Sequence, residues 1–427
     1  MEQQAIVALA VFLITYGMII AEKVHRTIVA MLGGLIVVLL GIVDVHSAVA
    51  RHIDFNTLGL LIGMMIIVSL TAKTGVFSYI AVVAAKKAKG EPVKIMVALA
   101  VITAVASAFL DNVTTVLLIV PVTFGITRQL RVPPFPFLFS QILASNIGGT
   151  ATLIGDPPNI MIGSAVKELT FLAFIENLAP IVIVIMAVQI PLFVLFFRKQ
   201  LRTSEEYRRG IMEMNERELI TDKRMLIRCL TVLGLTIVGF FLHQVLQAES
   251  SVVALTGAFL LLLLSGEHAL EEAFSRVEWT TIFFFIGLFT LVGGLVETGI
   301  INDLAVKAMD LTGGGETATA MLILWMSAIA SAFMDNIPFV ATMIPLIQDM
   351  GNMGISNLEP LWWSLALGAC LGGNGTLIGA SANLITAGLA AKEGYPITFL
   401  KFLKYGFPFM LLSVAISCLY VYLRYLL

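Results

Sequence analysis

The stretch SAFLDNVTTVLLIVP, at residues 107–121, recurs 224 residues later as SAFMDNIPFVATMIP, at residues 331–345. The same offset aligns further stretches on both sides without a gap, namely 54–81 with 278–305 and 148–159 with 372–383. An apolar composition alone does not place Asp-Asn and Gly-Gly pairs at one shared offset. The chain is therefore predicted to contain two copies of one unit.

The composition indicates a membrane protein. Of the 427 residues, 59% are hydrophobic and only 13% are charged. A soluble domain of this length needs a larger charged surface. This excludes a secreted disulfide scaffold, a nucleic-acid-binding protein and a cytosolic enzyme. The chain has no Walker A motif and no metal-ligating spacing of Cys or His, so we expect neither an enzyme nor a cofactor.

Each copy is predicted to be all-α, with five membrane spans, one re-entrant hairpin and one broken helix. The first copy places its spans at 5–21, 26–43, 55–73, 137–170 and 174–197, with the hairpin at 92–127. The second places them at 229–244, 252–266, 280–297, 361–394 and 402–424, with the hairpin at 318–347. We divide the chain into a first repeat (1–197), a linker (198–228) and a second repeat (229–427). Residues 76–89, which end in lysines, are predicted to form a helix on the membrane surface.

An odd number of spans inverts the second repeat relative to the first. Placing the linker, with its nine Lys and Arg, in the cytoplasm leaves 22 of the 26 basic residues inside. The four outside are Arg51, Lys167, Lys307 and Arg424. We therefore expect a multi-pass protein of the plasma membrane with both ends of the chain outside. The linker itself is expected to be a solvated tether.

Two Asp-Asn pairs lie in the middle of the predicted hairpins, Asp111-Asn112 and Asp335-Asn336. An ionised Asp in hydrocarbon normally pairs with a cation, binds an ion or takes up a proton. No Lys or Arg lies near either pair in the sequence, so we expect these residues to handle ions or protons. The alternative is that each Asp merely caps a helix. Thr114 and Thr115 follow the first pair only.

Two further interruptions are predicted to break helices inside the membrane. Gly-Gly permits backbone that a helix forbids, and Pro157-Pro158 would restart the chain. Freed carbonyls and half-helix ends can coordinate a cation, so a Na⁺ site is predicted between them and the two hairpin Asp residues. The alternative is a proline kink kept for packing. The candidate residues are Asn146, Gly148, Gly149, Thr150, Asp156 and Asn159 in the first copy, and Gly372, Gly373, Asn374, Thr376, Ser381 and Asn383 in the second.

Aromatic clusters are interpreted as facing lipid or the membrane interface rather than a ligand. The clearest are Phe283-Phe284-Phe285 and Trp362-Trp363.

The two hairpin motifs and the loops NIGGTATLIGDPPN and GGNGTLIGASAN resemble the ArsB/NhaD-like permeases of the ion transporter superfamily, most of all the branch of the melanosomal P protein. This resemblance covers nearly the whole chain. It implies a homodimer in the bilayer, with a scaffold and a region that moves by an elevator motion, and it puts the two Asp-Asn pairs at hairpin tips facing the broken helices. Dicarboxylate carriers of the superfamily have Ser where this chain has Asp, and two carboxylates would repel a dianion.

Two functions stay open. The first is a cation/proton antiporter, in which Asp111 and Asp335 hold Na⁺ or protons in turn and neighbouring Asn side chains supply neutral oxygens. The second is a permease for an anion or metalloid, such as arsenite, chloride or a small oxyanion, in which the Asp residues carry coupling protons. Both need only a small ion as partner, besides the lipid.

Overall fold

The computed structural model describes residues 2–21, 23–266 and 268–427. These residues form helices joined by turns and loops, and no strand occurs among them. Nine helices of this described part are long and apolar enough to cross a membrane. The predicted all-α membrane fold is confirmed.

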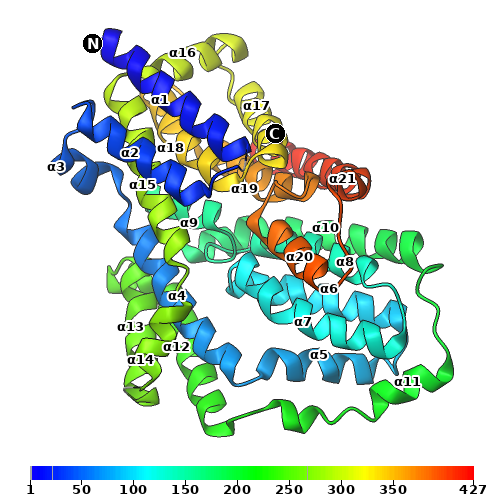
Figure 1. The fold of residues 1–427 in the computed structure, drawn as a ribbon. Coiled ribbons are helices and arrows are strands. Elements are labelled where there is room, and N and C mark those ends of the chain that lie inside the picture. Colours follow the sequence, from blue (N-terminus) through cyan, green and yellow to red (C-terminus); the bar gives the residue numbers. More distant parts are fainter. Residues whose placement is uncertain (1, 22, 267) are drawn as a thin grey trace.

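The helices follow one another in the same order twice (Figure 1). The first series is α1 (Glu2–Ala21), α2 (Arg26–Leu39), α3 (Val45–Ser47), the π-helix η1 (Ala48–His52), α4 (Phe55–Lys73), α5 (Val76–Lys87), α6 (Pro92–Phe109), α7 (Asn112–Leu130), α8 (Phe135–Gly149), α9 (Pro157–Ala165) and α10 (Phe171–Phe197). The second series is α12 (Lys223–Leu246), α13 (Ser250–Ser265), α14 (His268–Arg276), α15 (Trp279–Glu297), α16 (Ile300–Thr312), α17 (Glu316–Phe333), α18 (Asn336–Asn352), α19 (Glu359–Gly372), η3 (Gly373–Gly375), α20 (Ser381–Lys392) and α21 (Phe399–Tyr425). Between them lie α11 (Glu205–Met212) and η2 (Glu216–Leu219).

Packing follows the repeat as well. In each copy the first arm of the hairpin packs on the first half of the broken helix, as α6 on α8 and as α17 on α19. The copies also interlock, because α2 packs on α15 while α4 packs on α13. We call α1, α2, α4, α12, α13 and α15 the scaffold, and α6–α9 with α17–α20 the hairpin region. Figure 1 shows α2, α4, α13 and α15 along one edge of the molecule, with most of the hairpin region beside them.

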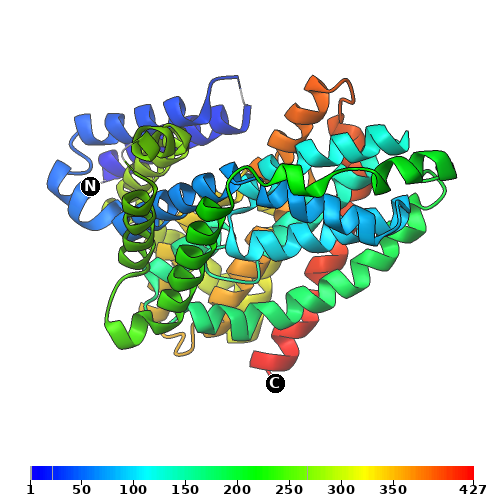
Figure 2. The same cartoon turned by 90° about the horizontal axis from the view of Figure 1, so that it is seen from below.

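The linker packs against the protein and is not a free tether, although most of its side chains are exposed as expected. Its Ile211 side chain is fully buried. The Lys86 ammonium of α5 donates to the Glu216 carboxylate (2.6 Å), and the Arg131 guanidinium lies 4.6 Å from the Tyr207 ring centre. Gly75, with φ of 80°, lies so close to the Leu219 carbonyl oxygen that an added Cβ would be 1.8 Å from it. Figures 1 and 2 both show the linker running along α5. Its charges and apolar side chains thus cover α5 and the open end of the first hairpin.

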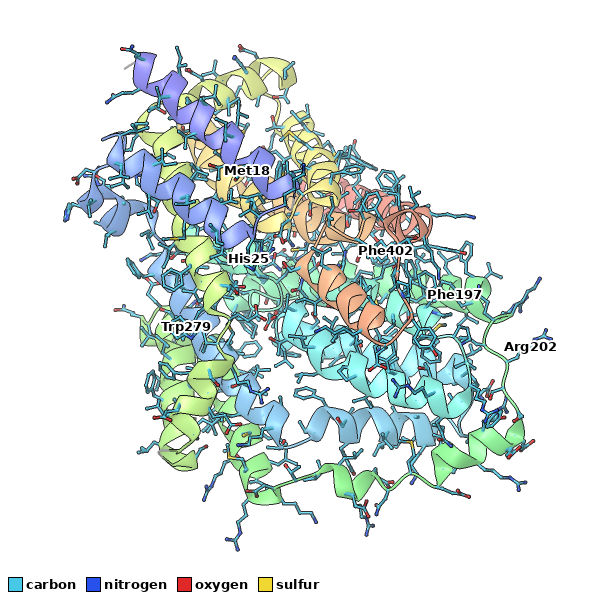
Figure 3. All side chains as sticks on the ribbon, in the orientation of Figure 1. Met18, His25, Phe197, Arg202, Trp279 and Phe402 are labelled. Atoms are coloured by element: carbon cyan, nitrogen blue, oxygen red, sulfur yellow. The ribbon has the colours of Figure 1, made fainter. Side chains whose placement is uncertain are left out.

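Several aromatic side chains that the sequence analysis placed against lipid are buried in the core of the protein. Phe284 and Phe285 are fully buried, and so is Trp363, so the lipid-facing interpretation is wrong for them. Phe283 is 48% exposed, as expected for a lipid-facing ring. A separate aromatic cluster joins α8, α10 and α21, and Figure 3 labels two of its members. This cluster is Phe135, Phe139, Phe193, Phe197, Phe402, Tyr405 and Phe409.

Candidate functional site

The tips of both hairpins meet the loops of both broken helices at one small cavity. Its volume is about 50 Å³. Five predicted site residues line it, and they come from four separate elements of the chain. The polar lining consists of Asp111, Asn112, Asp156, Asn336 and Ser381, together with Arg26, Glu278 and Thr281. The structure thus brings the two copies together at the residues that the sequence singled out.

The two hairpin acids both cap helices. Asp111 ends the turn before α7, and its carboxylate accepts from the Thr114 backbone N–H (2.8 Å) and the Thr114 hydroxyl (2.5 Å). Asp335 occupies the same place before α18 and accepts from the Ile337 N–H (3.1 Å). Such caps satisfy N–H groups that have no partner within the helix. Both carboxylate oxygens of Asp111 therefore accept from Thr114, whereas the Asp335 carboxylate has one oxygen left for other partners.

Asp156 differs from both, because its carboxylate caps nothing. It stands at the N-cap of α9, but the next two residues are Pro157 and Pro158, which have no N–H to donate. Its side chain is fully buried. One carboxylate oxygen is 3.3 Å from the Asn336 amide nitrogen, and the other has no hydrogen-bond partner. The two prolines offer this carboxylate no N–H, and the Asn159 N–H donates to the Asp156 backbone oxygen instead (3.0 Å), so the buried carboxylate stays free at the wall of the cavity.

Behind the cavity a chain of amides crosses from one copy to the other. The Asn112 amide nitrogen donates to the Asn146 oxygen (3.2 Å), and the Asn146 nitrogen donates to the oxygens of Asn374 (2.9 Å) and Asn383 (3.0 Å). All four side chains are buried. The Asn374 nitrogen and the Thr115 hydroxyl are left without partners. Unpaired buried polar groups are costly, so the Asn374 nitrogen is a donor that a polar ligand could satisfy.

The two broken-helix loops are closed in the same way. Asn159 donates from its side chain to the backbone oxygens of Thr150 (3.1 Å) and Thr152 (2.9 Å). Asn383 donates likewise to Gly373 (2.7 Å) and Thr376 (2.8 Å). The freed carbonyls that the sequence predicted as cation ligands therefore already accept hydrogen bonds. In the part of the chain that the structure describes, no three His, Cys, Asp or Glu side chains are grouped so that they could hold a metal ion.

Each hairpin is bonded to its own broken helix at matching positions. The Ser107 hydroxyl donates to the Ser145 backbone oxygen (2.7 Å), and Ser331 donates to Ala369 (2.6 Å). Further along, Thr376 donates to the Ala332 oxygen (2.5 Å), and the equivalent Thr152 donates to Ala108. These buried bonds tie hairpin and broken helix together in each copy.

The paired glycines act through close packing. Gly148 is helical, and a Cβ there would be 2.1 Å from the Ala104 backbone oxygen. Gly372 is helical too, with the Ala328 oxygen 2.5 Å from such a Cβ. The expectation that Gly-Gly breaks the helix is therefore wrong for both. Their neighbours Gly149 and Gly373 lie against the backbone of Gly155 and Gly379 in their own loops. None of the four is among the residues that line the cavity.

Sequence reasoning missed Arg26, a base that contacts one of the two acids although no Lys or Arg lies near either of them in the sequence. The Arg26 guanidinium is 2.5 Å from the Asp335 carboxylate and 2.8 Å from the Ser381 hydroxyl. It is 309 residues away from Asp335 in the sequence, so no local pattern signals the contact. The available signal was a single Arg at the start of an apolar run. Glu278, aligned with Asp54 of the first copy, was missed for the same reason.

Two larger cavities also occur, and only one of them shares lining residues, among them Arg26 and Ser381, with the small cavity. The first, of about 330 Å³, is lined by residues of the α1–α2 turn, the tip of the second hairpin and α20, including Arg26, Asp335 and Ser381. Figure 3 labels His25 at the end of α2 where this cavity lies. The second, of about 910 Å³, lies between η1, α9, α15 and α18 and contains the His52–Glu297 pair (3.1 Å). Only the first of these cavities reaches a hairpin Asp.

Comparison with known proteins places the chain among membrane transporters. It matches the CitMHS family, described as citrate transporter, over residues 16–368. It is 43% identical over 426 residues to an uncharacterized transporter of Mycobacterium bovis, with 99% of each chain covered. It is 42% identical over 427 residues to the 46 kDa membrane protein of Mycobacterium leprae, again with 99% of each covered.

More distant relatives were also found by sequence and by structure. The human P protein is 35% identical over 501 residues, a match covering 98% of this chain and 60% of that protein. The predicted relationship to the P protein is thereby confirmed. Among solved structures, the YdaH transporter of Alcanivorax borkumensis matches with a TM-score of 0.60 and 14% identity, covering 88% of this chain and 86% of that one. At this identity the match shows a shared fold.

Proposed function

We propose that this chain, which belongs to the CitMHS family of citrate transporters, is a secondary transporter that exchanges a small cation, best represented by Na⁺, for protons. The observation that carries the proposal is Asp156, a fully buried carboxylate with one unpartnered oxygen at the wall of a cavity that also contains Asp111. A carboxylate in such a place binds either a proton or a cation, and the two compete for the same oxygens.

Charge and size favour a small cation. Asp111, Asp156 and Glu278 line the small cavity, and Asp335 lies next to it, against a single guanidinium from Arg26. The amide oxygens of Asn112 and Asn336 supply neutral ligands of the kind that hard cations prefer. A volume of about 50 Å³ accommodates an ion with about one water molecule and no large organic anion.

The alternative is a proton-coupled or passive permease for an anion or metalloid, and two observations favour it. Arg26 provides one positive charge at the wall of the site. The family is described as citrate transporter, which makes citrate a candidate beside arsenite, chloride and small oxyanions. In this case the acids would carry protons, and the site would widen to admit the anion.

For the topology, we place the linker in the cytoplasm of a plasma-membrane protein and both ends of the chain outside. Five ion pairs away from the site support the inverted arrangement of the spans, because each joins two residues that it puts on one side, and the split of basic residues is what sets the cytoplasmic side. Lys73–Glu272, Lys86–Glu216 and Arg128–Glu393 would lie inside, and His52–Glu297 and Lys167–Glu249 would lie outside. The two hairpins then enter from opposite sides, and the second repeat is inverted.

For the mechanism, we propose that the hairpin region moves against the scaffold in an elevator motion within a homodimer, as the ArsB/NhaD-like resemblance implies. The matching bonds from Ser107 to Ser145 and from Ser331 to Ala369 support a hairpin region that moves as a unit. The cavity of about 330 Å³ beside Asp335 would be the access path from the cytoplasm.

One assay tests the function. Purified protein is reconstituted in liposomes that contain a pH-sensitive dye, and Na⁺, Li⁺, K⁺, chloride, arsenite or citrate is added in turn. Proton movement driven by Na⁺ or Li⁺, and absent in liposomes without protein, is the expected result. Proton movement driven by an anion alone would move the assignment to the permease.

A further inference from the structure

Arg26, Asp335 and Ser381 form a closed triangle of polar contacts at the second hairpin tip. One guanidinium nitrogen of Arg26 contacts the Asp335 carboxylate oxygen (2.5 Å) and the Ser381 hydroxyl (2.8 Å). The Ser381 hydroxyl in turn donates to the same carboxylate oxygen (2.8 Å). The Asp335 side chain is 9% exposed and that of Arg26 is 28% exposed. The Asp335 carboxylate is therefore largely buried, while Arg26 keeps partial exposure at the cavity of about 330 Å³.

The triangle joins two bodies that must separate during transport. Arg26 is the first residue of α2, which packs on α15, and its guanidinium lies 5.0 Å from the centre of the Phe284 ring on α15. Asp335 and Ser381 belong to the hairpin region. A second contact follows the same path, because the Tyr16 hydroxyl of α1 donates to the Pro338 backbone oxygen of α18 (2.7 Å). The scaffold thus holds the second hairpin through its tip.

The other hairpin tip is held differently. The residue aligned with Arg26 in the second copy is Ser250, which carries no charge. The carboxylate of Asp111 accepts its hydrogen bonds from Thr114 on its own hairpin. The aligned position after Asp335 is Pro338, which has no hydroxyl to offer. The two copies therefore differ at this point in the residues that neutralise or satisfy the acid.

We propose that Arg26 is the coupling residue of the transport cycle, a tethered cation that holds Asp335 while the site is empty and releases it when a mobile cation or proton takes over its charge. Loading then becomes the condition for movement, since the hairpin region cannot leave the scaffold while the pair is intact. Breaking the pair without a replacement would leave a buried charge uncompensated, which is strongly unfavourable. We call the contact between Arg26 and Asp335 the latch. The identity of the ion rests on the proposed exchange, whereas the latch does not.

Glu278 gives the released guanidinium a new partner. It lines the same small cavity as Arg26, and it stands immediately before α15 on the scaffold. Its carboxylate already accepts from the Thr281 hydroxyl (3.0 Å), which fixes its position. Arg26 can therefore pass from Asp335 to Glu278 without leaving the scaffold and without entering lipid.

The test follows the conformation and the transport separately. Leu384 lines the cavity of about 330 Å³ beside Asp335 and is 36% exposed. Leu384→Cys therefore reports whether this cavity is open to a water-soluble thiol reagent. In the Arg26→Gln background the equilibrium should shift away from the state seen here by about tenfold, and labelling should slow. Arg26→Lys, which keeps the charge, should fall between Arg26→Gln and the natural residue. The control is Lys23→Gln, an exposed charge three residues earlier in the same turn, which should label like the unmodified background.

Flux in liposomes provides the second measurement. With Arg26→Gln the empty carrier can return, so Na⁺ should leave loaded liposomes without matching proton uptake, and the ratio of Na⁺ to H⁺ should rise. Unchanged labelling in Arg26→Gln would overturn the latch. If labelling slows in Arg26→Gln but the protein transports no Na⁺, the latch is supported and Na⁺ is rejected as the transported ion. An unchanged elution profile in detergent shows that each variant is folded.

Discussion

The side-chain amide of Asn146 donates to the side-chain oxygen of Asn383, 3.0 Å away and 237 residues later in the chain. Asn146 belongs to the first broken helix and Asn383 to the second, so this bond joins the two copies at their centre, together with the bond from Asn146 to Asn374. Both side chains are fully buried. At the offset of 224 residues Asn146 aligns with Cys370 and Asn159 aligns with Asn383, and the Cys370 thiol lies 3.6 Å from the Asn159 side-chain oxygen.

Asn146→Ala should lower the stability of the protein by about 1–3 kcal/mol, because the oxygens of Asn374 and Asn383 lose their common donor in a buried place. Thermal melting in detergent would measure this. The control is Asn357→Ala, which removes an exposed bond to Glu316 and should change the melting temperature little. Equal melting temperatures for the two variants would contradict the central role of Asn146.

Asp156→Asn should reduce coupled transport by a factor on the order of 100 or more, because the group that exchanges proton and cation is gone. The variant should still fold, since this carboxylate caps no helix. Asp111→Asn should also fold, since Asn caps a helix nearly as well as Asp, and Asp335→Asn should fold because Glu278, which lines the same cavity as Arg26, can take over as its partner. Flux in liposomes and melting temperature measure the two effects. Normal flux in any one of the variants would show that its acid is structural.

The pH dependence of binding separates the two proposed functions. Protons and Na⁺ compete for the carboxylates of Asp111, Asp156 and Asp335, with Arg26 and Glu278 as the other charged groups at the site. Na⁺ affinity should therefore rise with pH and level off once the acids are ionised, and Na⁺ binding should release protons. Titrations of purified protein from about pH 5.5 to about pH 9 would measure both. An anion would show the opposite slope, and Na⁺ binding that is flat or falls with pH would reject the exchanger.

Gly148→Ala should destabilise the protein by about 1–3 kcal/mol, because the added methyl group would meet the Ala104 carbonyl. Gly125→Ala is the matched control, since Gly125 is also helical and has open space at the same position. The control should be neutral or slightly stabilising. If both variants melt alike, close packing is not the reason for the glycine.

The orientation can be tested with two cysteines at exposed positions. Ser204→Cys lies in the linker and Asp310→Cys lies in α16. In intact cells an impermeant thiol reagent should label Asp310→Cys and leave Ser204→Cys untouched until the cells are opened. The reverse pattern would overturn the proposed orientation, and labelling of both cysteines from the same side would overturn the inversion of the repeats.

The sequence predicted the helices of this protein well because each helix is an apolar run of consecutive residues between polar ends, and this pattern can be recognised without knowing the rest of the fold. It also predicted that both Asp-Asn tips and both loops would meet, since internal repetition is visible at one offset. Arg26 could not be predicted in this way. Its partner Asp335 lies in the other repeat, and the contact has no counterpart at the aligned Ser250, so symmetry gives no help. The burial of Phe284 and Trp363 was not predicted for a related reason. An apolar side chain on a membrane helix can face either lipid or a neighbouring helix, and the sequence pattern is the same in both cases.

Pro158 carries a consequence for how selectivity can change in such a protein. A search for functional residues looks for charges and hydroxyls, and a proline offers neither. Yet Pro158→Ala would restore an N–H group at the second position of α9, where Asp156 could cap it as Asp335 caps the Ile337 N–H at the second position of α18. The acidic composition of the site would stay the same, while the free oxygen would be lost to the backbone. A transporter can thus gain or lose an ion ligand through a residue that never touches the ion.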